Sequence, residues 1–301
     1  MSAAVSAGEH VAFGFRLHGV PPGALTPTDE PAWPALHVHC RVGPADAAPS
    51  AHLGDFSARL PLGGGDWLEL DRDKRTATYL TTETVDADTL IHPRLAPAAA
   101  VMARWLGRDA FHAGAVVADG GAWAVAGANE AGKSTLLASL AIGGMPVLTD
   151  DLLVVDRARI AYAGPRCIDL RRPVLLEHGP QRDRLRPVRD GSRERMDLPV
   201  APAAAPLRGW LFLEWGTRVQ AQACPPHARL GRLLKQRRWA TEAIDPRVLL
   251  DLAALPAWTL RRPRGREHMR AVAELLWELT RAATAGAPEP ARGAPSHPAA
   301  A

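Results

Sequence analysis

The chain has 301 residues, of which 47% are hydrophobic and 23% are charged, values typical of a soluble globular protein that buries its own core. No apolar run approaches the roughly 18 residues that a membrane-spanning helix needs, and the first residues do not resemble a secretion signal. The cysteines Cys40, Cys167 and Cys224 are odd in number and far apart. We therefore expect a cytoplasmic protein with no membrane partner.

Basic residues exceed acidic ones, with 36 Lys and Arg against 32 Asp and Glu. Their distribution does not indicate a nucleic-acid partner, because no basic cluster is interleaved with aromatic residues. Only Lys74, Lys133 and Lys235 are lysines, and arginines occur throughout the chain. We expect a solvated Arg-rich surface and no nucleic-acid binding.

Residues 1–107 are predicted to form a smaller β-rich N-terminal domain. Short β-type runs, separated by Pro and Gly, lie at residues 12–17, 35–42, 67–70 and 76–81. Pro97 then opens an alanine-rich run that ends at Leu106, before Gly107. Pro near the start and Gly just past the end predict a helix.

An α/β pattern begins at Phe111. Two β-type runs, HAGAVVA and AWAVAG, flank Asp119-Gly120-Gly121, which is a strong hairpin signal. Helical spacing follows at residues 134–142, and short strands are predicted at 146–149 and 152–155. The order strand, loop, helix, strand indicates an α/β domain, which we place at residues 108–283.

The rest of this domain is predicted to alternate strands with helices. Strands are expected at residues 167–170, 209–213 and 258–261, and helices at 228–239, 246–255 and 267–282. The Arg- and Pro-rich stretch 182–197 is expected to be a loop. The Pro/Ala-rich tail, residues 284–301, is expected to be disordered.

The sequence GANEAGKST lies between the second strand of the hairpin and the following helix. It matches the pattern of a phosphate-binding loop, whose glycines let backbone N–H groups and a helix N-terminus converge on phosphate oxygens. Lys133 is expected to reach the β- and γ-phosphates, and Ser134 to ligate Mg²⁺. We expect ATP, or GTP, to bind with Mg²⁺ at Gly127, Ala128, Asn129, Glu130, Ala131, Gly132, Lys133, Ser134 and Thr135.

Two adjacent acids, Asp150 and Asp151, follow the apolar strand that comes after this helix. An acid at such a strand end can hold Mg²⁺, and its neighbour can accept the proton of an attacking hydroxyl. We assign Asp150 to the metal and Asp151 to the general base, and the two roles could be exchanged. Only about 15 residues separate Ser134 from Asp150, fewer than in transporter-type and helicase-type ATPases.

Three features together resemble the HPr serine kinase/phosphorylase family, which includes kinases encoded beside lasso peptides and other ribosomally made peptides. They are the His112-Ala-Gly strand that opens the hairpin, the GANEAGKST loop and the Thr149-Asp-Asp strand end. The resemblance implies an α/β fold with a P-loop kinase core of the HPr kinase/phosphoenolpyruvate carboxykinase type. It also implies that the acceptor is a Ser or Thr hydroxyl of a peptide or small protein, which the β-rich N-terminal domain would help to recognise. It further implies that the protein forms a homo-oligomer.

By the same resemblance, His112 would lie near the transferred phosphate, and Arg171 or Arg195 would meet the phosphate or the acceptor. The loop departs from the family pattern by carrying Asn-Glu-Ala where Ser-Gly is common, and the later Arg-Gly-rich motif is not recognised. These departures put HPr itself, and the phosphorylase activity, in doubt. Two alternatives stay open: a nucleotide-dependent switch or assembly ATPase, and a metabolic kinase of the phosphoenolpyruvate carboxykinase kind.

Overall fold

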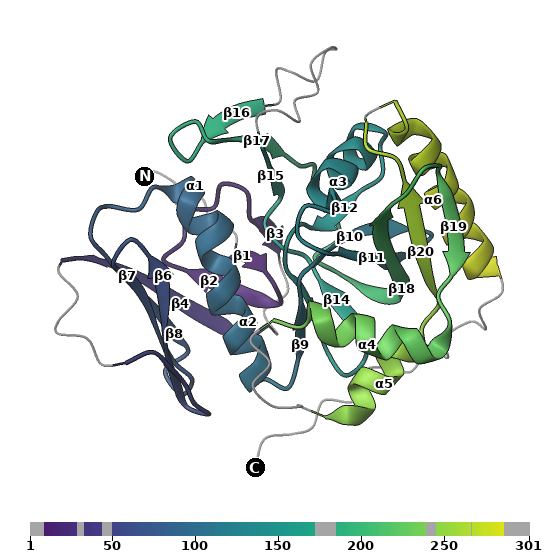
Figure 1. The fold of residues 1–301 in the computed structure, drawn as a ribbon. Helices are drawn as coiled ribbons and strands as arrows, with labels where there is room; N and C mark the ends of the chain where they lie inside the picture. Colours follow the sequence, from purple (N-terminus) through teal and green to yellow (C-terminus); the bar gives the residue numbers. More distant parts are fainter. Residues whose placement is uncertain are drawn as a thin grey trace, which may run out of the picture.

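The computed structural model describes residues 9–28, 33–43, 50–171, 185–238, 245–265 and 267–285. The described chain forms an eight-stranded sheet, a nine-stranded sheet and a small three-stranded sheet (Figure 1). It is a mixed α/β protein, as the sequence predicts. No helix in these ranges is long and apolar enough to cross a membrane.

The N-terminal sheet has the strand order β3-β1-β2-β4-β8-β7-β6-β5. Its strands are β1 (Glu9–Ala12), β2 (Phe15–His18), β3 (Thr26–Thr28), β4 (Ala35–Val42), β5 (His52–Leu53), β6 (Ser57–Gly63), β7 (Asp66–Asp71) and β8 (Thr76–Thr81). The single strand predicted at 12–17 is wrong, because Phe13 and Gly14 both have positive φ and reverse the chain between β1 and β2. The strands predicted at 35–42, 67–70 and 76–81 are confirmed.

Helix α2 (Leu95–Trp105) packs on this sheet, and the short segments α1 (Ala87–Thr89) and η1 (Leu90–Arg94) lead into it (Figure 1). It confirms the helix predicted from Pro97 to Leu106, with small shifts at both ends. The hydrophobic cluster between helix and sheet also contains Leu152, Val154 and Tyr162. The core therefore continues past Gly107, where the sequence places a domain boundary.

The nine-stranded sheet has the order β12-β10-β11-β18-β14-β13-β9, with β20 beside β18 and β19 beside β20. Its strands are β9 (Asp109–Phe111), β10 (Ala113–Ala118), β11 (Gly121–Gly127), β12 (Val147–Thr149), β13 (Leu153–Val155), β14 (Ile160–Tyr162), β18 (Ala204–Trp215), β19 (Gln220–Ala223) and β20 (Ala257–Arg262). The predicted hairpin at Asp119-Gly120 is confirmed as β10 and β11.

Two pairs of helices lie against the two faces of this sheet, α3 (Lys133–Ile142) with α6 (Met269–Ala285), and α4 (Pro226–Gln236) with α5 (Pro246–Ala254). Strand alternation explains this arrangement. Trp123 and Val125 of β11 pack with α3 and α6, whereas Ala124 and Ala126 belong to the cluster of α4 and α5. All four helices were predicted. Trp239, the expected end of α4, and residues 286–301 of the expected tail lie outside the described residues.

The third sheet has the order β15-β17-β16, formed by β15 (Cys167–Arg171), β16 (Leu185–Val188) and β17 (Arg193–Asp197). The loop predicted at 182–197 is therefore wrong over its described part. A tight turn joins β16 to β17, because Arg189, Asp190 and Gly191 all have positive φ. Residues 172–184 lie outside the described ranges.

Candidate functional site

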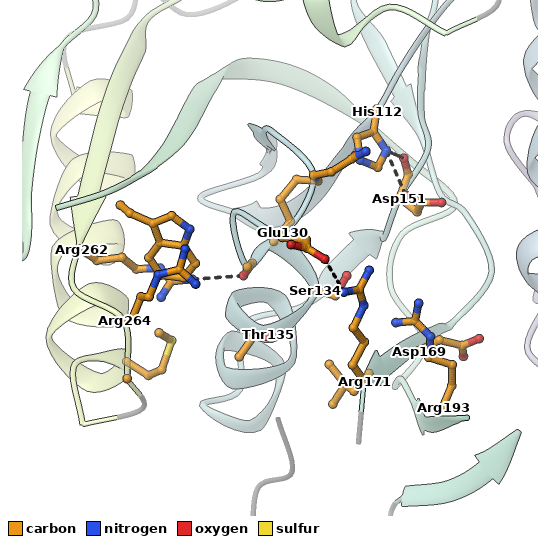
Figure 2. Close-up of a pocket in the computed structure, with 17 residues that line it drawn as sticks. His112, Glu130, Ser134, Thr135, Asp151, Asp169, Arg171, Arg193, Arg262 and Arg264 are labelled. Carbon is orange, nitrogen blue, oxygen red and sulfur yellow. Dashed lines mark hydrogen bonds and ion pairs between the residues drawn. The ribbon is translucent and has the colours of Figure 1, made fainter. Parts of the chain in front are cut away.

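The predicted phosphate-binding loop borders a cavity of about 720 Å³ (Figure 2). Its floor is the loop and the start of α3. The ends of β18 and β20 and the start of α6 form one side, and β15 and β17 form the other. Asn129, Glu130, Gly132, Lys133, Ser134 and Thr135 line the cavity, whereas Gly127, Ala128 and Ala131 do not.

The backbone of the loop makes a tight turn between β11 and α3. The N–H of Ala131 donates to the carbonyl of Ala128 at 3.1 Å, and Gly132 has a φ of 82°, which a side chain rarely tolerates. A Cβ on Gly127 would lie 3.1 Å from the Leu213 carbonyl oxygen, so a side chain there would press on β18. Helix α3 begins at Lys133, so its first N–H groups have no partner within the helix.

Lys133 is buried under this loop. Its Nζ donates to the carbonyls of Gly127 at 3.0 Å and Ala128 at 3.3 Å. Burial lowers its pKa, although the carboxylates of Asp151 and Asp150 oppose that shift. The ammonium therefore lies within the loop and beside both predicted acids.

The order of strands brings the two acids to the loop. Strand β10 is antiparallel to both β11 and β12, so β11 and β12 run in the same direction and end at the same edge of the sheet. Ser134 Oγ donates to Asp150 Oδ1 at 3.2 Å. Burial, with the charge of Asp151, raises the pKa of Asp150 to about 7. A Ser hydroxyl and a carboxylate thus meet at the N-terminus of α3.

Asp151 has a different environment. Its φ is 68°, and its Oδ1 lies 2.9 Å from Nδ1 of His112, which also lies 3.1 Å from the Asp151 carbonyl oxygen. Burial acts to raise the pKa of Asp151, but the hydrogen bond from His112 and nearby positive charges outweigh it and lower the pKa to about 2. Asp151 is therefore an ionised carboxylate facing the cavity, oriented by His112 (Figure 2).

The two predicted arginines lie in different places. Arg171 lines the cavity and pairs with Glu130 of the loop. Arg195 is fully buried, does not line the cavity and donates to Asp169 Oδ1 at 2.7 Å and Oδ2 at 3.0 Å. Its guanidinium also donates to Asp88 and to the carbonyl of His92. Of the two predicted arginines, Arg171 therefore lines the cavity, whereas the donors of Arg195 are occupied by other protein groups.

Sequence reasoning missed several residues that line the cavity, namely Asp169, Arg193, Trp215, Arg262 and Arg264. Arg193 lies opposite Arg171 across β15 and β17, and its pKa is lowered by burial and by the charges of Arg171 and Arg189. Trp215 and Arg262 are paired positions of the parallel strands β18 and β20. The Arg-rich run after the strand predicted at 258–261 was a weak signal for Arg262 and Arg264.

The oxygen atoms of Ser134 and Asp150 suit Mg²⁺, which prefers hard oxygen ligands and keeps several waters and phosphate oxygens. Within the described ranges no group of three or more His, Cys, Asp or Glu is arranged to hold a metal ion. A site with one carboxylate and one hydroxyl would therefore depend on phosphate oxygens to complete it. The surrounding cations, Lys133, Arg171, Arg193, Arg262 and Arg264, give the cavity the charge that a polyphosphate requires.

Comparison with known proteins identifies no family for the chain. No family model and no curated protein matches it. Among solved structures, one that is similar is the Hpr(Ser) kinase/phosphatase from Coxiella burnetii, with 11% sequence identity and a TM-score of 0.34. The match covers 59% of this chain and 99% of that one. A likeness this weak carries no argument about function, which depends on the site itself.

Proposed function

We propose that the protein is a Mg²⁺-dependent kinase that transfers the γ-phosphoryl group of ATP to a hydroxyl of a peptide or small protein. The observation that carries this proposal is the convergence, around one cavity, of the 127–135 loop with two acids in different environments. Asp150 meets the Ser134 hydroxyl, and Asp151 meets His112. Phosphoryl transfer needs a loop that binds the phosphates, an acid that holds the metal and an acid that accepts a proton.

The nucleotide would lie with its phosphates on the loop. The N–H groups at the start of α3 and the Lys133 ammonium would bind phosphate oxygens. Ser134 and Asp150 would hold Mg²⁺, which neutralises phosphate charge when it is bound. Lys133 now bonds to two loop carbonyls, so it would have to turn from them toward the phosphates. The same contacts would hold GTP.

Asp151 would act as the general base. Its carboxylate would accept the proton of the acceptor hydroxyl, whose oxygen would form a bond to the γ-phosphorus while the bond to the bridging oxygen breaks and ADP leaves. His112 would orient this carboxylate through the 2.9 Å contact. The site requires no covalent intermediate on the protein.

The acceptor would enter from the side of β15 and β17. Arg171 and Arg193 lie there at the cavity wall, opposite one another across two strands (Figure 2). Their guanidinium groups could bind oxygens of the transferred phosphate or of the acceptor. By the resemblance noted from the sequence, we propose a Ser or Thr residue as acceptor, in a peptide such as a ribosomally made natural-product precursor.

The test is transfer of radiolabelled phosphate from ATP to peptides encoded beside the gene, with Asp151→Asn as the diagnostic variant. We expect Asp151→Asn to bind Mg·ATP like the parent and to lose transfer, because the amide cannot accept the proton. Asp119→Asn is the matched control, since Asp119 lies in an exposed hairpin turn far from the loop and Asn tolerates its positive φ.

Two results would contradict this proposal. Transfer by Asp151→Asn at the parental rate would exclude Asp151 as the base. Rapid release of phosphate, without any phosphorylated peptide, would favour the switch or assembly ATPase, in which Asp151 would orient water instead of a hydroxyl.

A further inference from the structure

Arg262 is the last residue of β20, and it is only 2% exposed. Because β20 is parallel to β18, Arg262 lies beside Trp215, and both side chains reach the back of the loop at Gly132. Figure 2 shows Arg262 on the wall of the cavity opposite Arg171 and Arg193. The end of β20 therefore delivers a cation to the cavity wall, beside the predicted phosphate-binding loop.

The contacts of Arg262 are with backbone and an aromatic ring. Its Nη2 donates to the carbonyls of Ala131 and Gly132, each at 3.3 Å. Its guanidinium carbon lies 4.3 Å from the centre of the Trp215 ring. Its Nε is buried and has no hydrogen-bond partner, and no carboxylate pairs with Arg262 in the part of the chain that the structure describes.

Such a charge is costly to bury. A buried ion is normally paired with an opposite charge, and without one its charged form is disfavoured. Burial lowers the pKa of Arg262 to about 10, and no opposing group counteracts the shift. At neutral pH the guanidinium is still protonated, so the protein retains a buried positive charge that no carboxylate of the described residues neutralises.

The loop is shaped around this guanidinium. A Cβ on Gly132 would lie 2.2 Å from Arg262 Nη2, so a side chain there would require the guanidinium to move. The two bonded carbonyls belong to the peptides just before α3. Because a carbonyl and the next N–H point in opposite directions along the peptide plane, a donor that binds the Ala131 and Gly132 carbonyls would hold the N–H groups of Gly132 and Lys133 pointing away from Arg262.

We propose that Arg262 is a positioning residue for polyphosphate binding, which orients the Ala131–Lys133 peptides and supplies a buried positive charge that the bound phosphates neutralise. This inference rests on the proposed nucleotide site. It assigns to Arg262 a contribution to ligand affinity and not to the stability of the ligand-free protein.

The experiment measures binding of Mg·ATP and of inorganic tripolyphosphate by calorimetry, together with ligand-free thermal melting. Arg262→Met keeps much of the side-chain volume without the charge. We expect its affinity for both ligands to fall by on the order of ten-fold, from the loss of a charge within several ångströms of the phosphates. Its ligand-free melting temperature should equal or exceed that of the parent, because an unpaired buried charge has been removed.

Two further variants show whether the loss of affinity comes from the charge of Arg262 or from altered packing. Arg262→Lys retains the charge and should recover part of the lost affinity. Arg261→Met is the matched control, since Arg261 is the neighbouring residue of β20 and bonds to Glu214 at 3.0 Å and Gln222 at 3.3 Å away from the cavity. Its affinities should equal those of the parent.

The inference is overturned if Arg262→Met binds both ligands as the parent does, or if it melts well below the parent. It is also overturned if only Mg·ATP binding is affected, which would place Arg262 at the nucleoside, or if lysine recovers nothing. Absence of binding by the parent protein would refute the proposed nucleotide site as well, whereas every other outcome leaves that site intact.

Discussion

Arg195 and Arg262 are both fully buried, but Arg262 lines the cavity and Arg195 does not. The groups that surround the two guanidiniums also differ. Arg195 bonds to Asp169 of β15, to Asp88 of α1 and to the carbonyl of His92 in η1. It therefore connects the β15 side of the cavity to the N-terminal part of the chain. In the part of the chain that the structure describes, Arg262 bonds to loop carbonyls and stacks on Trp215. Arg195 therefore belongs to a structural ion-pair network, whereas the surroundings of Arg262 are those we propose for a residue that serves a ligand.

The largest expected loss of unfolding free energy is that caused by Arg195→Met. It would leave the buried Asp169 carboxylate without its main partner, and breaking a buried ion pair costs about 3–5 kcal/mol. Urea denaturation should show this loss, whereas Arg262→Met should show none. If the two variants lost equal free energy of unfolding, the distinction between a structural Arg195 and a ligand-binding Arg262 would be wrong.

A smaller loss is expected for Gly132→Ala. The positive φ of Gly132 alone disfavours a side chain by about 1–2 kcal/mol, and the collision of the new Cβ with Arg262 adds to it. In the background of Arg262→Ala the collision is gone, so Gly132→Ala should cost less there. A double-mutant cycle by urea denaturation measures this coupling, and strictly additive losses would argue against direct contact.

Arg186→Ala should have a modest effect, although Arg186 pairs with the same Asp88 as Arg195. The Arg186 side chain is 41% exposed, and exposed ion pairs contribute about 0–1 kcal/mol. Urea denaturation of the Arg186→Ala and Arg195→Met variants compares the loss of an exposed ion pair of Asp88 with the loss of a buried one. A loss for Arg186→Ala as large as that for Arg195→Met would show that burial does not decide the contribution.

The smallest effect concerns pH. Burial lowers the pKa of His92 below its ordinary value of 6.5; Asp169 and Asp151 oppose the shift, and Arg189 and Arg195 reinforce it. The unfolded chain therefore binds a proton that the folded one excludes, so this contribution to stability is present above pH 6.5 and is lost as the pH falls below it. We expect the parent to exceed His92→Gln in free energy of unfolding at pH 7.5, and this excess should be smaller at pH 5.5. Urea denaturation at the two pH values measures it. A constant difference would contradict the assignment.

The loop and the two acids could be predicted because their signals are local. Gly127 to Thr135 and Asp150-Asp151 lie in one strand–loop–helix–strand segment, and the Asp-Gly-Gly turn fixes the pairing of β10 with β11. The direction of β12, and with it the meeting of Asp150 with Ser134, follows from the two antiparallel pairings of β10. The resemblance implied only that His112 lies near the transferred phosphate, and its contact with Asp151 was not predicted.

The other side of the cavity could not be predicted from local patterns. Arg262 reaches the loop because β18 pairs with both β11 and β20, a strand order that no spacing in the sequence specifies. Arg193 and Arg195 are two residues apart on a strand that was taken for a loop. Only the pairing of β15 with β17 decides that Arg193 lines the cavity and that Arg195 is held by Asp169.

The most direct test of the central claim is a calorimetric titration of Mg·ATP into the parent protein and into Lys133→Ala. We predict that the parent binds at one site per chain, and that the variant binds on the order of 100-fold more weakly, because it loses a charge-assisted contact to the β- and γ-phosphates. Asp119→Asn should bind like the parent. Equal affinities for the parent and Lys133→Ala, or no binding by the parent, would contradict the account.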